Sequence, residues 1–158
     1  AWPRGYDVNP LPADTTRLAQ ACAAMPPMYA ELPSALPHAV LLRGAARRRV
    51  GGLDVHSYAS WYAALVDLSL RMSGMGWRNV LCQTAFVGRC LEGMAADGDL
   101  EALAARWPTW PARLARFLMD DPLHATRQQL QMYYDNPIMP LPQGDLFVAG
   151  STAVQESV

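Results

Sequence analysis

The sequence has few of the features that mark secreted, membrane-spanning or nucleic-acid-binding chains. Its three cysteines are odd in number and form no C-x-x-C pair, which predicts reduced, mostly buried thiols rather than a disulfide framework. No apolar run approaches the roughly 20 residues that cross a bilayer. Neither sign of charge dominates, because 13 basic and 14 acidic residues give a formal net charge of -1. We therefore expect no transmembrane segment and no nucleic acid partner.

Local catalytic motifs are missing as well. The histidines His38, His56 and His124 are not three or four positions from one another or from a cysteine, which argues against a zinc site built from local spacing. No G-x-S-x-G, Walker-type or G-x-G-x-x-G segment occurs, so no local phosphate-binding loop is predicted. The basic run Arg47–Arg49 is typical of a solvated helix face.

The composition that remains is that of a globular chain, 51% hydrophobic and 17% charged. Its 158 residues suffice for one domain with a core. We expect a single domain or fragment over residues 1–158, with the following parts: a proline-rich lead with a short helix over 1–36, an α/β core over 37–92, helices over 97–134 and an extended tail over 135–158.

The α/β prediction depends on short apolar runs. His38–Arg43 and Asn79–Cys82 favour buried strands, Ala85–Val87 extends the second, and Leu146–Val148 is a candidate edge strand. Because helical patterns fill the rest of the chain, the predicted fold has a few strands and a mainly helical C-terminal part.

Helical periodicity is clearest in the middle of the chain. A helix is predicted over residues 58–73, ended by Gly74 and Gly76, with Asp67 nearer a groove than the core centre. The expected buried face consists of Trp61, Leu65, Leu68 and Met72. A shorter helix over residues 45–50 ends at Gly51–Gly52. The other helices have candidate N-terminal caps at Asp14 or Thr15, Asp97 or Asp99, Thr109 and Asp121.

Residue chemistry alone does not assign a function. Asp67 and Arg71 lie four positions apart, which is typical of a helix-stabilising ion pair. Trp61, Tyr62 and Trp77 are of a type found more often in cores than on ligand platforms. On these grounds the chain is an α/β domain of unknown role.

Two segments in order resemble a known family. AVLLRGAARRRVGGLD (residues 39–54) and VDLSLRMSGMGWRNVLCQTAFV (residues 66–87) resemble the acceptor-side half of a bacterial family 2 inverting glycosyltransferase of the GT-A fold. The family patterns are R-x-A-x-x-x-V-G-G-[FL]-D and, on the following helix, E-D-x-D-[LF]-x-x-R-x-x-x-x-G-[WY]-[RK]. The segment LAARWPTWPARLARFLMDDPL also resembles the helical tail of bacterial members, where W-x-x-R-x-x-x-F-x-x-x-D-P-L occurs.

The resemblance implies a parent protein of polysaccharide biosynthesis, cytoplasmic or peripheral at the inner membrane. It would transfer a sugar from a nucleotide-diphosphate sugar to a glycan or lipid-linked acceptor. Asp67 becomes the candidate catalytic residue. The implied acceptor-binding residues are Trp61, Tyr62, Arg71, Trp77, Arg78 and Asp54.

The match departs from the family at its catalytic positions. The family's acidic pair aligns with Ala64 and Leu65. Its strand-end His, which binds the metal, aligns with Gly88 or Arg89. The nucleotide-binding half with its Asp-X-Asp motif is missing, so that half is an implied partner. No metal ligand is assigned here, and Mg or Mn is expected only for a complete parent.

These departures leave three alternatives open. The chain alone is expected to be inactive, with the catalytic site degenerate and Asp54 the nearest replacement acid. Alternatively, the alignment of this helix with the family pattern is shifted by two residues, and Asp67 is itself the general base. The third is a non-catalytic interaction module whose helices over 97–134 form a docking surface.

Overall fold

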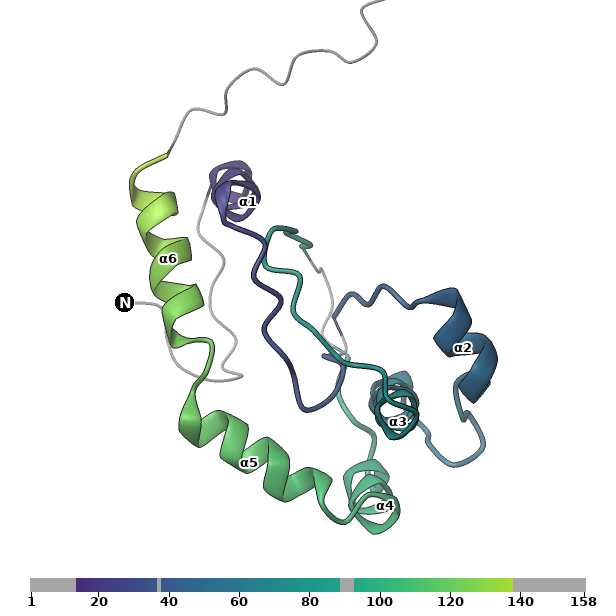
Figure 1. The fold of residues 1–158 in the computed structure, drawn as a ribbon. Coiled ribbons are helices and arrows are strands. Elements are labelled where there is room, and N and C mark those ends of the chain that lie inside the picture. The colour runs from purple at the N-terminus through teal and green to yellow at the C-terminus, as the bar shows by residue number, and fades with distance from the viewer. Residues whose placement is uncertain (1–13, 37, 89–92, 138–158) are drawn as a thin grey trace, which may run out of the picture.

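The computed structural model describes residues 14–36, 38–88 and 93–137, and within these ranges six α-helices are joined by extended segments. The helices are α1 (Thr15–Ala24), α2 (Gly44–Val50), α3 (Trp61–Gly74), α4 (Asp99–Arg106), α5 (Trp110–Asp120) and α6 (His124–Asp135). Figure 1 shows α2 to α6 following one another in an arc, with α1 closing it beside α6. None of these helices is long and apolar enough to cross a membrane, α3 being the longest at 14 residues.

The expected α/β fold, a partial GT-A-like unit with a few strands, is wrong for the part of the chain that is described. It contains no sheet, only an isolated antiparallel bridge between Glu31 and Val80. Two backbone hydrogen bonds flank that bridge, from Leu32 N to the carbonyl of Asn79 (2.9 Å) and from Leu81 N to that of Ala30 (2.8 Å). Two bonds between extended segments do not make a ladder, because a stable strand needs a longer run of paired backbone groups.

The predicted strand His38–Arg43 is surface chain without strand structure, and Leu41 is fully exposed. An apolar run forms a buried strand only when neighbouring strands satisfy its N–H and C=O groups, and the described chain places none there. Ala85–Val87 likewise pairs with no strand. The candidate edge strand Leu146–Val148 lies outside the described residues.

Helix α3 is confirmed close to its predicted bounds, and it lies at the centre of the packing. The Ser60 hydroxyl caps its first turn by accepting from Ala63 N (3.2 Å), so residues 58–60 stay outside the helix. All residues from Ala63 to Leu70 are buried. A helix that is buried around its whole circumference must pack on more than one side.

Two hydrophobic clusters flank α3. The first joins it to α4 and the start of α5 through Tyr58, Ala63, Ala64, Val66, Leu70, Leu103 and Trp110. The second joins it to α2 through Ala35, Ala46, Leu65, Leu68 and Met72. Trp61, predicted to be buried with this face, is instead 49% exposed. It stands at the first position of the helix, beyond both clusters.

The predicted caps are borne out at α1 and α2. Asp14 accepts from Arg17 N (2.8 Å) at the start of α1, and Gly51, with φ 84°, closes α2. Asp99 begins α4 but does not cap it. Its buried carboxylate accepts from the backbone N–H groups of Ala59 and Ser60 (2.9 Å each), so it fixes the entry into α3.

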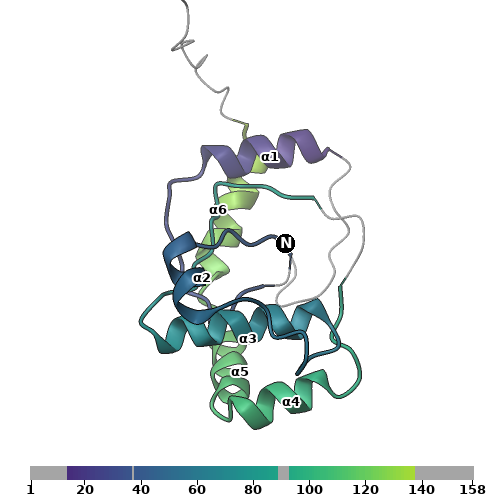
Figure 2. The ribbon, with the colours of Figure 1, turned by 90° about the vertical axis from the view of Figure 1, so that its right-hand side faces the viewer.

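The two ends of the described chain meet where α1 crosses α6 (Figure 2). The guanidinium of Arg17 donates to the carbonyls of Tyr134 (2.6 Å) and Asp135 (3.0 Å) at the end of α6. It also lies 4.9 Å from the centroid of the Tyr134 ring. A cation placed at the unsatisfied carbonyls of a helix C-terminus is stabilising, so this contact holds the arc closed.

Candidate functional site

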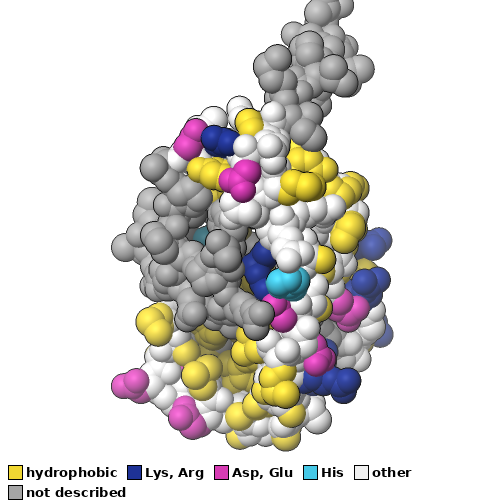
Figure 3. Space-filling model, turned by 90° about the vertical axis from the view of Figure 1, so that its left-hand side faces the viewer, with side chains coloured by type: hydrophobic (Ala, Val, Ile, Leu, Met, Phe, Trp, Pro, Cys, Tyr) yellow, Lys and Arg dark blue, Asp and Glu magenta, His cyan; other side chains and the backbone are white. Residues whose placement is uncertain are grey.

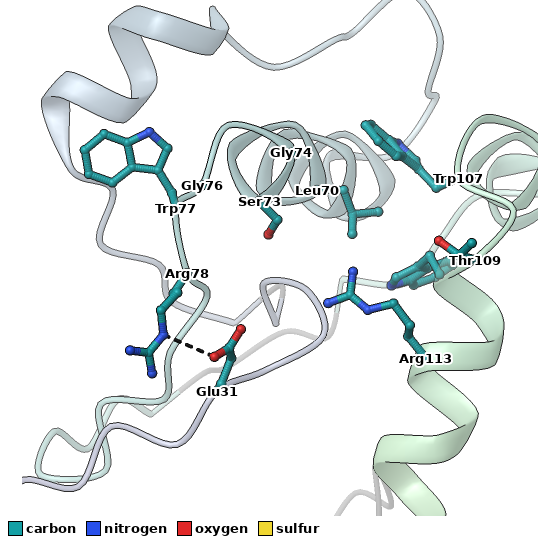
Figure 4. A pocket seen from close by; sticks show the side chains of 11 residues that line it. Glu31, Leu70, Ser73, Gly74, Gly76, Trp77, Arg78, Trp107, Thr109 and Arg113 are labelled. Atoms are coloured by element: carbon teal, nitrogen blue, oxygen red, sulfur yellow. Dashed lines mark hydrogen bonds and ion pairs between the residues drawn. The ribbon is translucent and has the colours of Figure 1, made fainter.

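A pocket of about 410 Å³ lies between the end of α3 and the start of α5 (Figure 4). That volume is within the usual range of small-molecule sites. The pocket is lined by Glu31, Leu70, Ser73, Gly74, Gly76, Trp77, Arg78, Trp107, Thr109, Trp110 and Arg113.

The pocket combines residues from two separate parts of the sequence. Gly76, with φ 88°, makes the turn that brings Trp77 and Arg78 to one side. Trp110 and Arg113 are one turn apart on α5 and form the other side. The G-W-R turn and the W-x-x-R segment, which are about 30 residues apart in the sequence, thus converge on one pocket.

The two arginines of the pocket differ in their contacts. Arg78 donates through Nε to Glu31 (3.1 Å) in an exposed pair. Arg113 reaches from α5 into the space between the walls, toward Leu70 and Ser73 (Figure 4). The arrangement offers donors to a ligand from α5, and a carboxylate from the opposite side.

Trp77, the aromatic residue of the Gly-Trp-Arg turn, presents little of its ring to the pocket. Its ring is turned toward α2 (Figure 4), where the Arg43 guanidinium lies 5.1 Å from the ring centroid. The ring also packs against the cluster that includes Leu68 and Met72. Trp107, above Leu70 (Figure 4), also lines the pocket, with its ring directed toward α3.

Behind the pocket, Asp67 is the centre of a buried polar network. It is fully buried, so the expectation that it lies near a groove is wrong. Its carboxylate accepts from Arg71 Nε (2.8 Å), Trp107 Nε1 (2.9 Å) and the Tyr58 hydroxyl (3.3 Å), and it pairs with Arg106 Nε (3.3 Å). A buried charge is tolerated only when it is paired and hydrogen-bonded in this way.

The same network connects α2, α3 and α4. Arg71 also donates to the carbonyls of Val50 (2.6 Å) and Gly52 (2.7 Å), which terminate α2. Arg106, at the end of α4, donates to Asp54 (2.8 Å). The structure therefore brings together three residues that the sequence pattern had singled out, namely Asp54, Asp67 and Arg71.

The network shifts the ionisation of its members. The hydrogen bond from Arg106 is the largest cause that lowers the pKa of Asp54 from 3.8 to about 2. The same bond raises the pKa of Arg106. Burial, followed by the charge of Asp67, raises the pKa of Tyr58. The Asp54 carboxylate is therefore held as an ion opposite the Arg106 guanidinium.

The six predicted acceptor-binding residues do not form one site. Two line the pocket, Trp77 and Arg78. Asp54 and Arg71 belong to the network. The remaining two lie at the other end of α3, where Trp61 is exposed and Tyr62 packs against a hydrophobic cluster.

The sequence interpretation assigned no role to four residues that the structure makes prominent. These are Arg106, Trp107, Trp110 and Arg113. The signal was present, because all four lie in the segment LAARWPTWPARLARF, whose tryptophans and arginines recur at helical spacing. Local spacing could not indicate that this segment faces α3.

The positions of the family's acidic pair are part of the hydrophobic core. Ala64 is 1% exposed and belongs to one cluster, while Leu65 belongs to the other. A carboxylate at either position would be buried among apolar side chains. Across residues 14–36, 38–88 and 93–137, no group of three or more His, Cys, Asp or Glu side chains could hold a metal ion.

No protein-family model matches this chain, and no curated protein or solved structure resembles it at a significant level.

Proposed function

We propose that the chain is a saccharide-binding portion of a glycosyltransferase-like protein and does not itself catalyse transfer. In this proposal the parent uses a nucleotide-diphosphate sugar, and the pocket at the end of α3 holds a glycan or lipid-linked acceptor. One observation carries the proposal. Trp77 and Arg78 line the same pocket as Trp110 and Arg113, although the two pairs come from separate segments that each resemble a family pattern.

The chemistry of the pocket supports a sugar as its occupant. Saccharides present apolar C–H faces and hydroxyl edges, so they suit sites that combine indole surface with side chains able to donate and accept hydrogen bonds. Trp107 supplies indole surface, Thr109 a hydroxyl, and Glu31 and Arg113 charged groups. Polar and charged side chains make up much of this lining, which suits a ligand rich in hydroxyl groups.

The surroundings of Asp67 support a non-catalytic role. A general base must come within hydrogen-bond reach of the acceptor hydroxyl, directly or through one water. Asp67 has no exposed surface, and its oxygens already accept from Arg71, Trp107 and Tyr58. Its role in the proposal is to hold the wall of the pocket.

A side chain added inside the pocket tests the proposal. Gly74 lines the pocket and Gly52 does not, and a Cβ added at either position meets no atom within 4 Å. We expect at least one of a panel of neutral and acidic oligosaccharides to bind saturably in calorimetry. Gly74→Phe should abolish this binding and Gly52→Phe should retain it. The proposal fails if no saccharide binds, or if Gly74→Phe binds as well as the unmodified chain.

A second candidate, the helical docking module, is favoured by the outer surface of α5 and α6. Met119 is 84% exposed, Met132 is 54% exposed, and α6 buries none of its residues. Figure 3, which views the molecule from the side on which α5 and α6 lie in Figure 1, shows hydrophobic side chains over its lower half and again along its upper right edge. Met119→Glu separates the two candidates, because it should leave saccharide binding unchanged while disrupting any assembly that depends on this surface.

A further inference from the structure

The pocket contains an arginine without a counter-ion. The Arg113 guanidinium, which lies between the pocket walls (Figure 4), has no ion pair or hydrogen bond within the described ranges 14–36, 38–88 and 93–137. Its neighbours differ in this respect. Arg78 is paired with Glu31, and Arg116, on the same helix, is paired with Asp120 (3.3 Å).

A second donor in the pocket lacks an acceptor. Trp110 is 6% exposed, its side chain lines the pocket, and its Nε1–H has no partner among the described residues. Nearly all buried donors in folded proteins have a partner, so each exception needs an explanation. Trp110 precedes Arg113 by one helical turn, which places both donors on one face of α5.

The pocket lining carries more positive than negative charge, which agrees with the two hydrogen-bond donors that lack partners. Arg78 and Arg113 oppose a single carboxylate, Glu31, so one positive charge is uncompensated. A neutral sugar hydroxyl would satisfy a donor but not the charge. The planar fork of an arginine is best matched by a carboxylate or phosphate, which accepts two parallel N–H bonds.

We infer that the pocket takes an acidic saccharide, with an indole against the ring and the acid group on Arg113. This inference depends on the proposed function, because it names the ligand class of the same pocket. The anionic group is a carboxylate, as in a uronic acid, or a phosphate ester on the sugar. Glu31 lies on the opposite wall beside Arg78, where it accepts from sugar hydroxyls.

The test is a calorimetric titration of the full 158-residue chain. The probes are three matched ligands, namely glucuronate-terminated, glucose-6-phosphate-terminated and glucose-terminated oligosaccharides of equal length. The variants are Arg113→Met, Arg113→Lys and, as a matched control on the same helix, Arg116→Met. Both arginines are exposed, so circular dichroism should show unchanged folding in all three variants.

We expect one acidic ligand to bind about tenfold or more tightly than the neutral one, as expected for a hydrogen-bonded ion pair. Arg113→Met should remove that preference, Arg113→Lys should retain part of it, and Arg116→Met should leave it intact. The tighter of the two acidic ligands identifies the acid group as carboxylate or phosphate.

Two results would overturn the inference in distinguishable ways. Equal affinity for acidic and neutral ligands, unaffected by Arg113→Met, removes the acidic class and leaves a neutral saccharide pocket. Absence of binding by all three ligands removes the saccharide function together with the inference.

Discussion

The indole Nε1–H of Trp107 donates to Oδ1 of Asp67 over 2.9 Å, which connects a pocket-lining side chain to a fully buried carboxylate. Trp107 follows the last residue of α4, whereas Asp67 is in the middle of α3. The bond thus fixes the side-chain conformation of Trp107 through Asp67, a buried group that no ligand can contact. Asp67 is a positioning residue whose loss should affect both stability and the pocket.

Asp67→Asn keeps the size of the side chain but removes its charge, leaving Arg71 and Arg106 without their shared partner. We expect the free energy of unfolding to fall by about 3 kcal/mol, the order typical of breaking a buried ion pair. Urea denaturation measures the change. Asp97→Asn, at an exposed carboxylate, is the control and should change stability by less than about 0.5 kcal/mol. A loss near 1 kcal/mol or less would mean that Asp67 acts only as a simple helix ion pair.

Asp99→Ala should detach the start of α3. The carboxylate accepts from the backbone of Ala59, Ser60 and Ala96, and also from the Ser60 hydroxyl. Its removal leaves these donors unmatched in a partly buried place, so we expect a loss of ~1.5–3 kcal/mol in urea denaturation. Glu101→Ala, at an exposed position on the same helix, is the matched control. Equal stabilities of the two variants would contradict the anchoring role of Asp99.

The ion pair between Asp54 and Arg106 should make stability depend on pH in the acid range. Because the folded-state pKa of Asp54 is lowered from 3.8 to about 2, its contribution is complete above pH 3.8 and is lost as the pH falls toward 2. We expect Asp54→Asn to be less stable than the unmodified chain at pH 6, with the difference shrinking as the pH falls below 3.8 and vanishing only below about pH 2. Urea midpoints at several pH values measure this difference. A difference that does not vary with pH would exclude the ion pair as its source.

Leu68→Ala tests the packing of α3 against α2. Leu68 is 2% exposed within the cluster that includes Ala46 and Met72. Truncation of a buried leucine typically costs ~2–5 kcal/mol, because a cavity adds to the lost transfer free energy. Leu118→Ala, at a 42% exposed position on α5, should cost far less. Thermal or urea unfolding compares the two, and a small effect of Leu68→Ala would show that this interface is not part of the stable core.

Much of the helical structure could be predicted from local chemistry. The repeat of Leu65, Leu68 and Met72 predicted one side of α3, and Asp14 and Gly51 marked ends of α1 and α2 because capping depends on the adjacent turn alone. The same local reasoning predicted strands that the described residues do not form. The run His38–Arg43 has a strand-like composition, yet a strand exists only where another segment pairs with it.

For the candidate site, the sequence by itself determined which chemical groups were available, namely the acid and arginine on α3, the Gly-Trp-Arg turn and the tryptophans near α5. Only the tertiary structure decided how they were used. Burial on all sides of α3 made Asp67 an internal, hydrogen-bonded carboxyl group rather than a groove residue, and the approach of α5 set Arg113 opposite Glu31. Burial and pairing depend on contacts between segments distant in sequence. Local periodicity specifies the face on which a residue lies but not what covers that face.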